Sequence, residues 1–246
     1  MGNKGSKGTV LITGATGDIG RAIATRFAGG GWNIICHYFS SKERAVALKS
    51  IIEKYKVNCA LFRANLLSER QLSVFISRLK KINIDSLINN AGTCVGHKHF
   101  DRLTVRDITS TFMVNTFAPT LLAAAVFKRM KARRFGRVVN ISSIAAKYGS
   151  SSHSIHYGTS KLALEGLTKT LAREGAKHNV LVNTIRPGVI NTKFHKKFPK
   201  DMKKRVKLIP LRKIGTPADI ADMAYCLGSE KNNFITNEII TISGGE

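Results

Sequence analysis

Residues 9–20 read Thr-Val-Leu-Ile-Thr-Gly-Ala-Thr-Gly-Asp-Ile-Gly, an apolar run that passes into a glycine-rich turn. The apolar half is typical of a buried strand, and the amphipathic stretch that follows is typical of a helix. Glycines in a strand-to-helix turn let the backbone approach a pyrophosphate, which then lies at the N-terminus of the helix. A plain tight turn would also explain them, but their place after the first strand of a βαβ unit favours a dinucleotide site.

Short apolar runs and longer amphipathic stretches alternate along the rest of the chain. The apolar runs predict strands at Thr9–Thr13, Asn33–His37, Asn58–Arg63, Asp85–Asn89, Arg137–Ile141, Val180–Ile185 and Glu238–Ile242. The amphipathic stretches predict helices near 18–29, 41–55, 68–81, 104–132, 156–177 and 217–228. This alternation predicts an α/β fold, a Rossmann-type doubly wound parallel β-sheet flanked by helices. We expect a single domain over residues 9–246, with residues 1–8 as a polar N-terminal lead-in.

One long stretch, 191–215, fits neither pattern. It follows the carboxyl end of a strand, which is where doubly wound sheets bind their ligands. We interpret it as a lid on the substrate side.

The chain is strongly basic. Its 246 residues include 40 Lys and Arg but only 15 Asp and Glu, which gives a formal charge of +25. Such a field attracts nucleic acid, anionic membranes, phosphate-bearing substrates and acidic proteins, although a general compositional bias would produce it too. We expect no stable membrane insertion, because no apolar run approaches 18 uncharged residues. The four cysteines form no metal-ligand motif, so we expect reduced thiols, no metal site and a cytoplasmic protein.

A tyrosine and a lysine, Tyr157 and Lys161, lie four residues apart in a predicted helix, which places both on one face. The reference pKa of a phenol is about 10, so a tyrosine needs help to exchange protons near neutrality. A cation about 4 Å away contributes roughly 4 kcal/mol at an effective dielectric of about 20, which lowers the phenol pKa by about 3. Tyr157 is therefore a candidate general acid–base group. Ser142 and Ser143 end a predicted strand, and their hydroxyls could reach the same carbonyl.

Taken together, these motifs resemble those of the short-chain dehydrogenase/reductase family, over nearly the whole chain. The glycine turn resembles the family's cofactor loop, and Asn89-Asn90-Ala91-Gly92 resembles the strand-four motif that supports the sheet and borders the cofactor. Pro187-Gly188, followed by Thr192, resembles the segment that closes on the nicotinamide amide. The ending, from Gly215-Thr216-Pro217 to Ser243-Gly244-Gly245, also follows the family. Motifs in this order and at these distances are very specific.

The resemblance implies a catalytic set of Asn115, Ser143, Tyr157 and Lys161. Tyr157 would donate a proton, and Ser143 would bond to the carbonyl oxygen on which negative charge develops. Lys161 would lower the pKa of Tyr157 and bind the nicotinamide ribose, and Asn115 would position a water that relays protons to Lys161. The implied cofactor site contains Gly14, Thr16, Gly17, Asp18, Ile19, Gly20, Tyr38, Ser40, Ser41, Asn65, Leu66, Asn90, Ala91, Gly92, Tyr157, Lys161, Pro187, Gly188, Val189, Ile190 and Thr192.

Two features depart from the family pattern. The family usually has a glycine where this chain has Asp18. The carboxylate either faces the phosphates, which would repel the cofactor, or turns outward to cap the helix, and we favour capping. Ser143 lies fourteen residues before Tyr157, one more than usual, and the polar loop 150–153 can absorb the extra residue. Ser142 is the fallback for the catalytic serine.

The end of the second strand bears on cofactor choice. NAD-preferring members place an Asp there to hold the ribose hydroxyls. This chain reads Cys36-His-Tyr-Phe-Ser-Ser-Lys42, without an acid. The absence favours NADP(H), with Ser40, Ser41 or Lys42 near the 2′-phosphate, although the arginine often found at position 39 in NADP-binding relatives is Phe39. NAD(H) is the alternative.

Within the family, the chain is most similar to the 3-oxoacyl-(acyl-carrier-protein) reductases of bacterial fatty-acid synthesis. That similarity implies a homotetramer that reduces 3-oxoacyl groups to 3-hydroxyacyl groups on the carrier protein with NADPH. One alternative is a dehydrogenase for another alcohol or ketone, such as a sugar, a steroid or a xenobiotic. The other is a non-enzymatic relative that binds nucleic acid, against which the intact catalytic set argues.

The similarity also implies a docking site for the acidic carrier protein, made of basic residues beside the mouth of the active site. The docking positions fall on Arg134 and on His178, with Lys177 beside it. Arg134 belongs to a basic cluster with Lys128, Arg129, Lys131, Arg133 and Arg137. The predicted lid adds Lys193, Lys196, Lys197, Lys200, Lys203, Lys204, Arg205 and Lys207.

Overall fold

The computed structural model describes residues 6–193 and 202–246. Within them, seven strands form one parallel sheet in the order β3-β2-β1-β4-β5-β6-β7. The strands are β1 (Thr9–Ile12), β2 (Asn33–Tyr38), β3 (Cys59–Arg63), β4 (Ser86–Asn89), β5 (Gly136–Ile141), β6 (Val180–Pro187) and β7 (Ile239–Ile242). The chain reverses its direction of travel across the sheet between β1 and β4, and such a switch point is where doubly wound sheets bind ligands.

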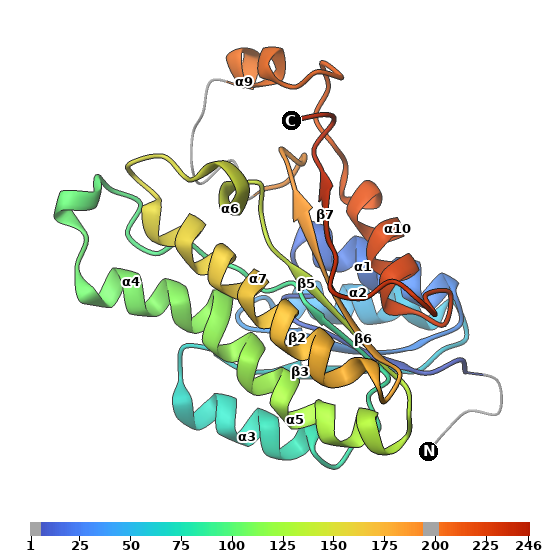
Figure 1. Ribbon diagram of the computed structural model, residues 1–246. Coiled ribbons are helices and arrows are strands. Elements are labelled where there is room, and N and C mark those ends of the chain that lie inside the picture. Colours follow the sequence, from blue (N-terminus) through green and yellow to red (C-terminus); the bar gives the residue numbers. More distant parts are fainter. Residues whose placement is uncertain (1–5, 194–201) are drawn as a thin grey trace.

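Helices cover both faces of this sheet (Figure 1), so the predicted α/β fold is confirmed. One layer contains α1 (Asp18–Gly29), α2 (Lys42–Glu53) and α10 (Pro217–Gly228). The other contains α3 (Glu69–Leu79), α4 (Val105–Phe112), α5 (Ala118–Ala132) and α7 (Ile155–Ala176). Shorter helical segments are η1 (Phe100–Arg102), α6 (Ala145–Tyr148) and α9 (Met202–Leu208).

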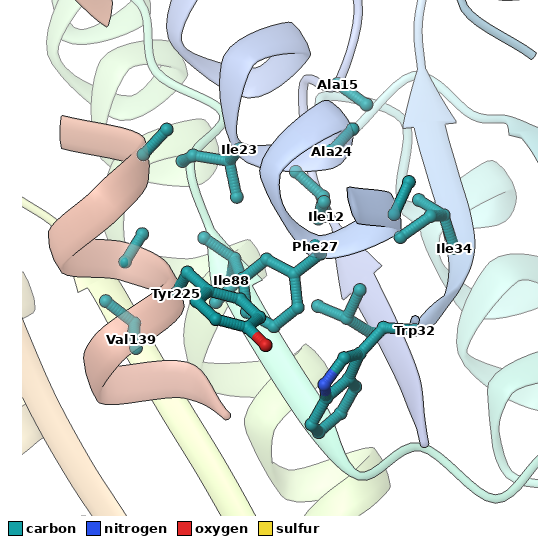
Figure 2. Close-up of a cluster of buried hydrophobic side chains, with 14 of the residues drawn as sticks. Ile12, Ala15, Ile23, Ala24, Phe27, Trp32, Ile34, Ile88, Val139 and Tyr225 are labelled. Carbon is teal, nitrogen blue, oxygen red and sulfur yellow. The ribbon is translucent and has the colours of Figure 1, made fainter. Parts of the chain in front are cut away.

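Each face of the sheet buries its own hydrophobic cluster. On the α1 side, Phe27 packs edge-on against Trp32 and Tyr225, with ring centroids 5.5 and 5.1 Å apart (Figure 2). On the other side of the sheet, Leu79 of α3 and Leu122 of α5 are fully buried in the second cluster. Because helices cover both faces, the inner strands β1, β2, β4, β5 and β6 are buried along most of their length rather than at alternate residues.

The helix predicted across 104–132 is interrupted. A π-helical turn, η2 (Met113–Phe117), joins α4 to α5 and places Asn115 in a fully buried position. Such a turn shifts the following helix by one residue and often marks a functional site. The apolar pattern on either side conceals this shift. The stretch Val105–Ala132 is also long and apolar enough to cross a membrane, but 56% of its apolar window is buried within the fold.

The stretch 191–215, predicted to be irregular, contains the helix α9, so the prediction was wrong at 202–208. Its sequence, Met-Lys-Lys-Arg-Val-Lys-Leu, consists largely of good helix formers, but so many like charges conceal the pattern. A bridge between Ile190 and Gly215 holds the two ends of the stretch together. Residues 194–201, with Lys196, Lys197 and Lys200, lie outside the described residues, as does the side chain of Lys203.

Candidate active site

A cavity of about 1040 Å³ opens at the carboxyl ends of the strands. Its wall contains Ser143, Tyr157 and Lys161 and nineteen of the twenty-one predicted cofactor residues. The two exceptions are Tyr38 and Ser41. Successive side chains of a strand point to opposite faces, so His37 and Phe39 face the cavity while Tyr38 is buried in the core. Ser41 directly precedes α2 and does not line the cavity.

The strand-four motif holds the glycine turn in shape. Gly14 has a φ of +63°, a conformation that favours glycine. The Asn90 side chain donates to the carbonyls of Thr13 and Gly14, at 2.9 and 3.2 Å. At Gly20, a Cβ would lie only 2.4 Å from the Gly14 carbonyl oxygen and 2.7 Å from Asn90 Nδ2. The packing therefore requires glycine at Gly20, and the turn leaves the N-terminus of α1 open to an anion.

A buried histidine, which the sequence reasoning missed, also supports this turn. Gly14 N donates to His37 Nδ1 at 3.2 Å, and His37 Nε2 lies 3.1 Å from the Ala64 carbonyl oxygen. Burial lowers the pKa of His37 to about 4, so the ring is neutral near pH 7. A neutral ring that accepts at Nδ1 carries its proton on Nε2 and donates to Ala64. One imidazole therefore joins the ends of three neighbouring strands, β1, β2 and β3.

The cavity wall near the end of β2, where the fold type predicts that adenosine binds, contains the basic residue Arg44, and we call this the adenosine end. Arg44 lines the wall together with Phe39 and Ser40, whereas Lys42 does not. The residues predicted for contact with a 2′-phosphate were Ser40, Ser41 and Lys42, so Arg44 was missed. Arg44 lies in the first turn of α2, two residues after Lys42, and no pattern in the sequence separates the two.

The expectation that Asp18 caps its own helix is wrong. Asp18 is the first residue of α1, and no side chain caps that helix. Its Oδ2 instead accepts a hydrogen bond from the backbone N–H of Lys193, at 2.6 Å. The carboxylate therefore links the glycine turn to the start of the segment that follows β6.

Ser143, rather than the fallback Ser142, faces the tyrosine. The Ser143 hydroxyl hydrogen-bonds the Tyr157 phenol. Ser142 is buried and donates to Glu165 Oε1 at 2.7 Å. Between Ser143 and Tyr157 the chain forms α6 and then a loop that begins at Gly149, whose φ is +83°.

Lys161 is close to Tyr157 without lowering its pKa in this structure. The Lys161 ammonium donates to the Ile141 carbonyl at 2.8 Å and lies 6.0 Å from the centre of the Tyr157 ring. Burial lowers the pKa of Lys161 to about 8. Burial also raises the pKa of Tyr157, and the hydrogen bond from Ser143 opposes that rise. The expected depression of the phenol pKa is therefore wrong here, because the effect of burial exceeds that of the hydrogen bond from Ser143.

Asn115 lies behind the cavity rather than in its wall. Its Oδ1 accepts from the backbone of Thr93, and its Nδ2 donates to the Thr93 carbonyl, both at 2.8 Å. Nδ2 also donates to Ser160 Oγ at 2.9 Å. Asn115 therefore joins the segment after β4 to the helix that carries Tyr157 and Lys161.

The predicted docking positions lie far from the cavity of their own chain. Arg134 precedes β5, whereas Ser143 follows it, and the six residues of β5 span about 20 Å. Lys177 and His178 likewise precede β6. The expectation that these residues flank the mouth is wrong within a single chain. They lie at the amino ends of the strands, whereas the cavity lies at the carboxyl ends. Arg137, counted in the surface cluster, is buried and donates to the Asn232 carbonyl at 2.8 Å.

Comparison with known proteins agrees with this geometry. The family model described as enoyl-(acyl carrier protein) reductase matches residues 14–246. The 3-oxoacyl-(acyl-carrier-protein) reductase FabG of Aquifex aeolicus (strain VF5) is 35% identical over 238 residues, which are 96% of this chain and 95% of that protein. The 3-oxoacyl (acyl-carrier-protein) reductase of Agrobacterium tumefaciens C58, crystallised with NADP bound, has a TM-score of 0.89 and 28% identity, covering 98% of this chain and 95% of that chain. NAD+-bound xylitol dehydrogenase has a TM-score of 0.88 and 25% identity, covering 99% and 100%.

The fold and the cavity define a dinucleotide-binding α/β protein. With the family match over nearly its whole length, the chain belongs to the short-chain dehydrogenase/reductase family, and the predicted resemblance is confirmed. It is an NAD(P)-dependent oxidoreductase of that family, which acts on alcohol and ketone groups.

Proposed function

We propose that this protein is a cytoplasmic, homotetrameric reductase that converts 3-oxoacyl groups on acyl carrier protein to 3-hydroxyacyl groups with NADPH. The observation that carries the proposal is the meeting of Ser143, Tyr157 and Lys161 in one cavity with the glycine turn. The 35% identity to a 3-oxoacyl-(acyl-carrier-protein) reductase over most of both chains supports this substrate class.

The residues of the cavity suit a dinucleotide. A Cβ at Gly14 would meet Ala91, and a Cβ at Gly20 would meet the Gly14 carbonyl oxygen. The two glycines therefore allow a tight turn whose backbone can approach a pyrophosphate. Arg44 and Ser40 lie where a 2′-phosphate could be bound, which favours NADPH over NADH. When bound, NADPH supplies a hydride to the substrate carbonyl carbon.

The protein's own residues would supply the proton and stabilise the developing charge. Tyr157 donates its phenolic proton to the carbonyl oxygen, and its raised pKa keeps that proton on the phenol near neutrality. The Ser143 hydroxyl, which hydrogen-bonds Tyr157 in this structure, would turn its single proton to the same oxygen as negative charge develops. Lys161, with a pKa of about 8, is charged near pH 7 and stabilises the tyrosinate left behind. Asn115 fixes the backbone beside this group and, in the proposed relay, positions a water.

The tetramer would reconcile the docking residues with the cavity. Exposed apolar side chains on α4, η2, α5 and α7, namely Val105, Phe117, Leu121 and Leu162, support contacts between copies of the chain. In such an assembly, Arg134, Lys177 and His178 of one subunit would serve the cavity of a neighbouring subunit. An acidic carrier protein would bind there by charge complementarity.

A substrate panel tests the proposal. Acetoacetyl groups on carrier protein and on a small thiol, together with polyols and steroid ketones, are assayed with NADPH and with NADH. We expect the highest kcat/KM for the carrier-bound substrate with NADPH. Arg134→Glu should raise its KM at least tenfold, about 1.4 kcal/mol, and leave the small thioester unaffected. Preferred turnover of a polyol with NAD+ would instead assign the protein to the sugar dehydrogenases.

A further inference from the structure

A buried ion pair lies directly beneath the catalytic group. Arg186 donates to both carboxylate oxygens of Glu165, from Nε at 2.7 Å and from Nη2 at 2.6 Å. Ser142 adds a third hydrogen bond to Glu165 at 2.7 Å. The Glu165 side chain is only 2% exposed, so water screens its charge poorly, and the Arg186 side chain is partly buried, at 17% exposed.

The three partners come from the three segments that carry the active site. Glu165 lies four residues after Lys161, on the same face of α7. Ser142 directly precedes Ser143 at the end of β5, and its hydroxyl also approaches the Lys161 carbonyl at 3.3 Å. Arg186 lies near the end of β6 and directly precedes Pro187, where the segment that lines the cavity begins. The Glu165 carboxylate therefore links α7 to the ends of β5 and β6.

Stability alone is a weak reason for this arrangement. Burying a charged pair costs several kcal/mol for each ion, and apolar residues of similar volume are often as stable or more stable. One layer deeper, α7 is joined to the sheet by a neutral network in which Asn140 donates to Thr168 at 2.8 Å. A neutral network can therefore join this helix to the sheet. What the ion pair adds is a bidentate, directional contact that fixes orientation.

We propose that Glu165 and Arg186 are positioning residues of the reaction. Resting on the function proposed above, their pair sets the distance between Ser143 and Tyr157 and the position of the segment that begins at Pro187. Misplacement of a reacting group by about 1 Å can reduce a rate about a hundredfold. The ion pair therefore acts on turnover through the geometry of its neighbours, without touching the substrate.

The test separates positioning from stability with a paired replacement. Removing one charge would leave the other buried and unpaired, so neither single variant is informative. The double variant Glu165→Leu/Arg186→Met replaces the pair with apolar side chains. We expect its melting temperature to stay within a few degrees of wild type and its Kd for NADPH within threefold. Its kcat should fall at least tenfold. A kcat within twofold of wild type would overturn the proposal.

A matched control lies away from both the cavity and the docking residues. Arg26 of α1 and Asp222 of α10 form an exposed ion pair at 2.6 Å. Arg26→Met/Asp222→Leu removes an Arg–carboxylate contact between two helices and should leave kcat unchanged. An equal loss of kcat in this control would show that the loss of any such ion pair lowers turnover, which contradicts a specific positioning role.

Ser142→Ala provides a second variant that removes one hydrogen bond and no charge. If the double variant does not fold, this variant decides: we expect a kcat at least threefold below wild type, and an unchanged kcat overturns the proposal. The substrate with the highest wild-type turnover in the panel is used throughout. Wild-type protein inactive on every substrate would contradict the proposed function itself, whereas an active wild type with equally active variants contradicts only the positioning role.

Discussion

The two ends of the cavity are built differently. At the catalytic end, Lys161 is buried and bonded to the protein, and Tyr157 is bonded to Ser143. At the adenosine end, Phe39 is 53% exposed and Ser40 is exposed as well. Buried groups that share hydrogen bonds act as a unit, whereas exposed groups contribute separately and are screened by water and salt. Substitutions at the first end should therefore change turnover, and substitutions at the second should change cofactor affinity.

Tyr157→Phe gives the largest expected effect and tests the catalytic end directly. Phe keeps the ring and deletes only the proton that the reaction needs. We expect kcat to fall at least a hundredfold, in the range typical of lost general acid catalysis. Affinity for NADPH, measured by fluorescence titration, should change less than threefold. Retention of more than about a tenth of wild-type kcat, a loss under about 1.4 kcal/mol, would contradict the role assigned to this phenol.

The stability of the adenosine end should depend on acid through His37. Its pKa is about 4 in the folded protein and 6.5 in the unfolded chain, so the folded state disfavours the protonated ring. The resulting stability is fully present above pH 6.5 and is lost as the pH falls from 6.5 to 4. A pKa difference of this size corresponds to about 3 kcal/mol.

Chemical denaturation between pH 7 and pH 4 measures this dependence, with His37→Asn as the comparison. The Asn carbonyl can still accept from Gly14 N, but the side chain does not titrate. We expect the variant to lose about 3 kcal/mol less than wild type over this range. Parallel curves for the two proteins would mean that other groups control the acid response.

The same contrast explains how much could be predicted from the sequence. The helical spacing of Tyr157 and Lys161 and the strand end at Ser143 determine that these groups meet, because regular elements with buried contacts permit little else. The parallel sheet also follows from the alternation of strands and helices, whereas that alternation does not determine the order of the strands. Near Arg44, exposed side chains are not restricted by packing, so the sequence did not distinguish it from Lys42 or Ser41.

Three other contacts that were not predicted share a single physical cause. The bond from Lys193 to Asp18, the support of Gly14 by His37 and the ion pair of Glu165 with Arg186 all join residues that are distant in sequence. Local patterns contain no information about such contacts. The π turn at Asn115 is local, but the apolar side chains on both sides continue a helical pattern across it.

Arg44→Ala tests the exposed adenosine end of the cavity, with a smaller expected effect. If Arg44 binds the 2′-phosphate, its removal deletes a charge-assisted contact of about 1.5–3 kcal/mol. We expect Kd for NADPH to rise at least tenfold, while Kd for NADH and kcat at saturating NADPH stay within twofold. Lys42→Ala is the matched control, because Lys42 lies on the same turn of chain outside the cavity wall. Equal losses for the two cofactors would place the 2′-phosphate elsewhere.

The smallest expected effect concerns Asp18, whose carboxylate joins the start of α1 to the segment after β6. Asp18→Ala removes the acceptor for the Lys193 N–H, and a hydrogen bond of this kind contributes about 0.5–1.5 kcal/mol. Asp18→Asn keeps an acceptor oxygen and removes only the charge. We expect the free energy of unfolding to fall by about 1 kcal/mol in the Ala variant and by a few tenths of that in the Asn variant.

Because the carboxylate lies in the wall of the phosphate-binding turn, both variants should bind NADPH at least as tightly as wild type. Equal stability of the Ala variant and wild type would mean that the contact contributes nothing. Weaker NADPH binding by the Asn variant would mean that the charge itself, acting on Lys193 or the turn, supports the cofactor site.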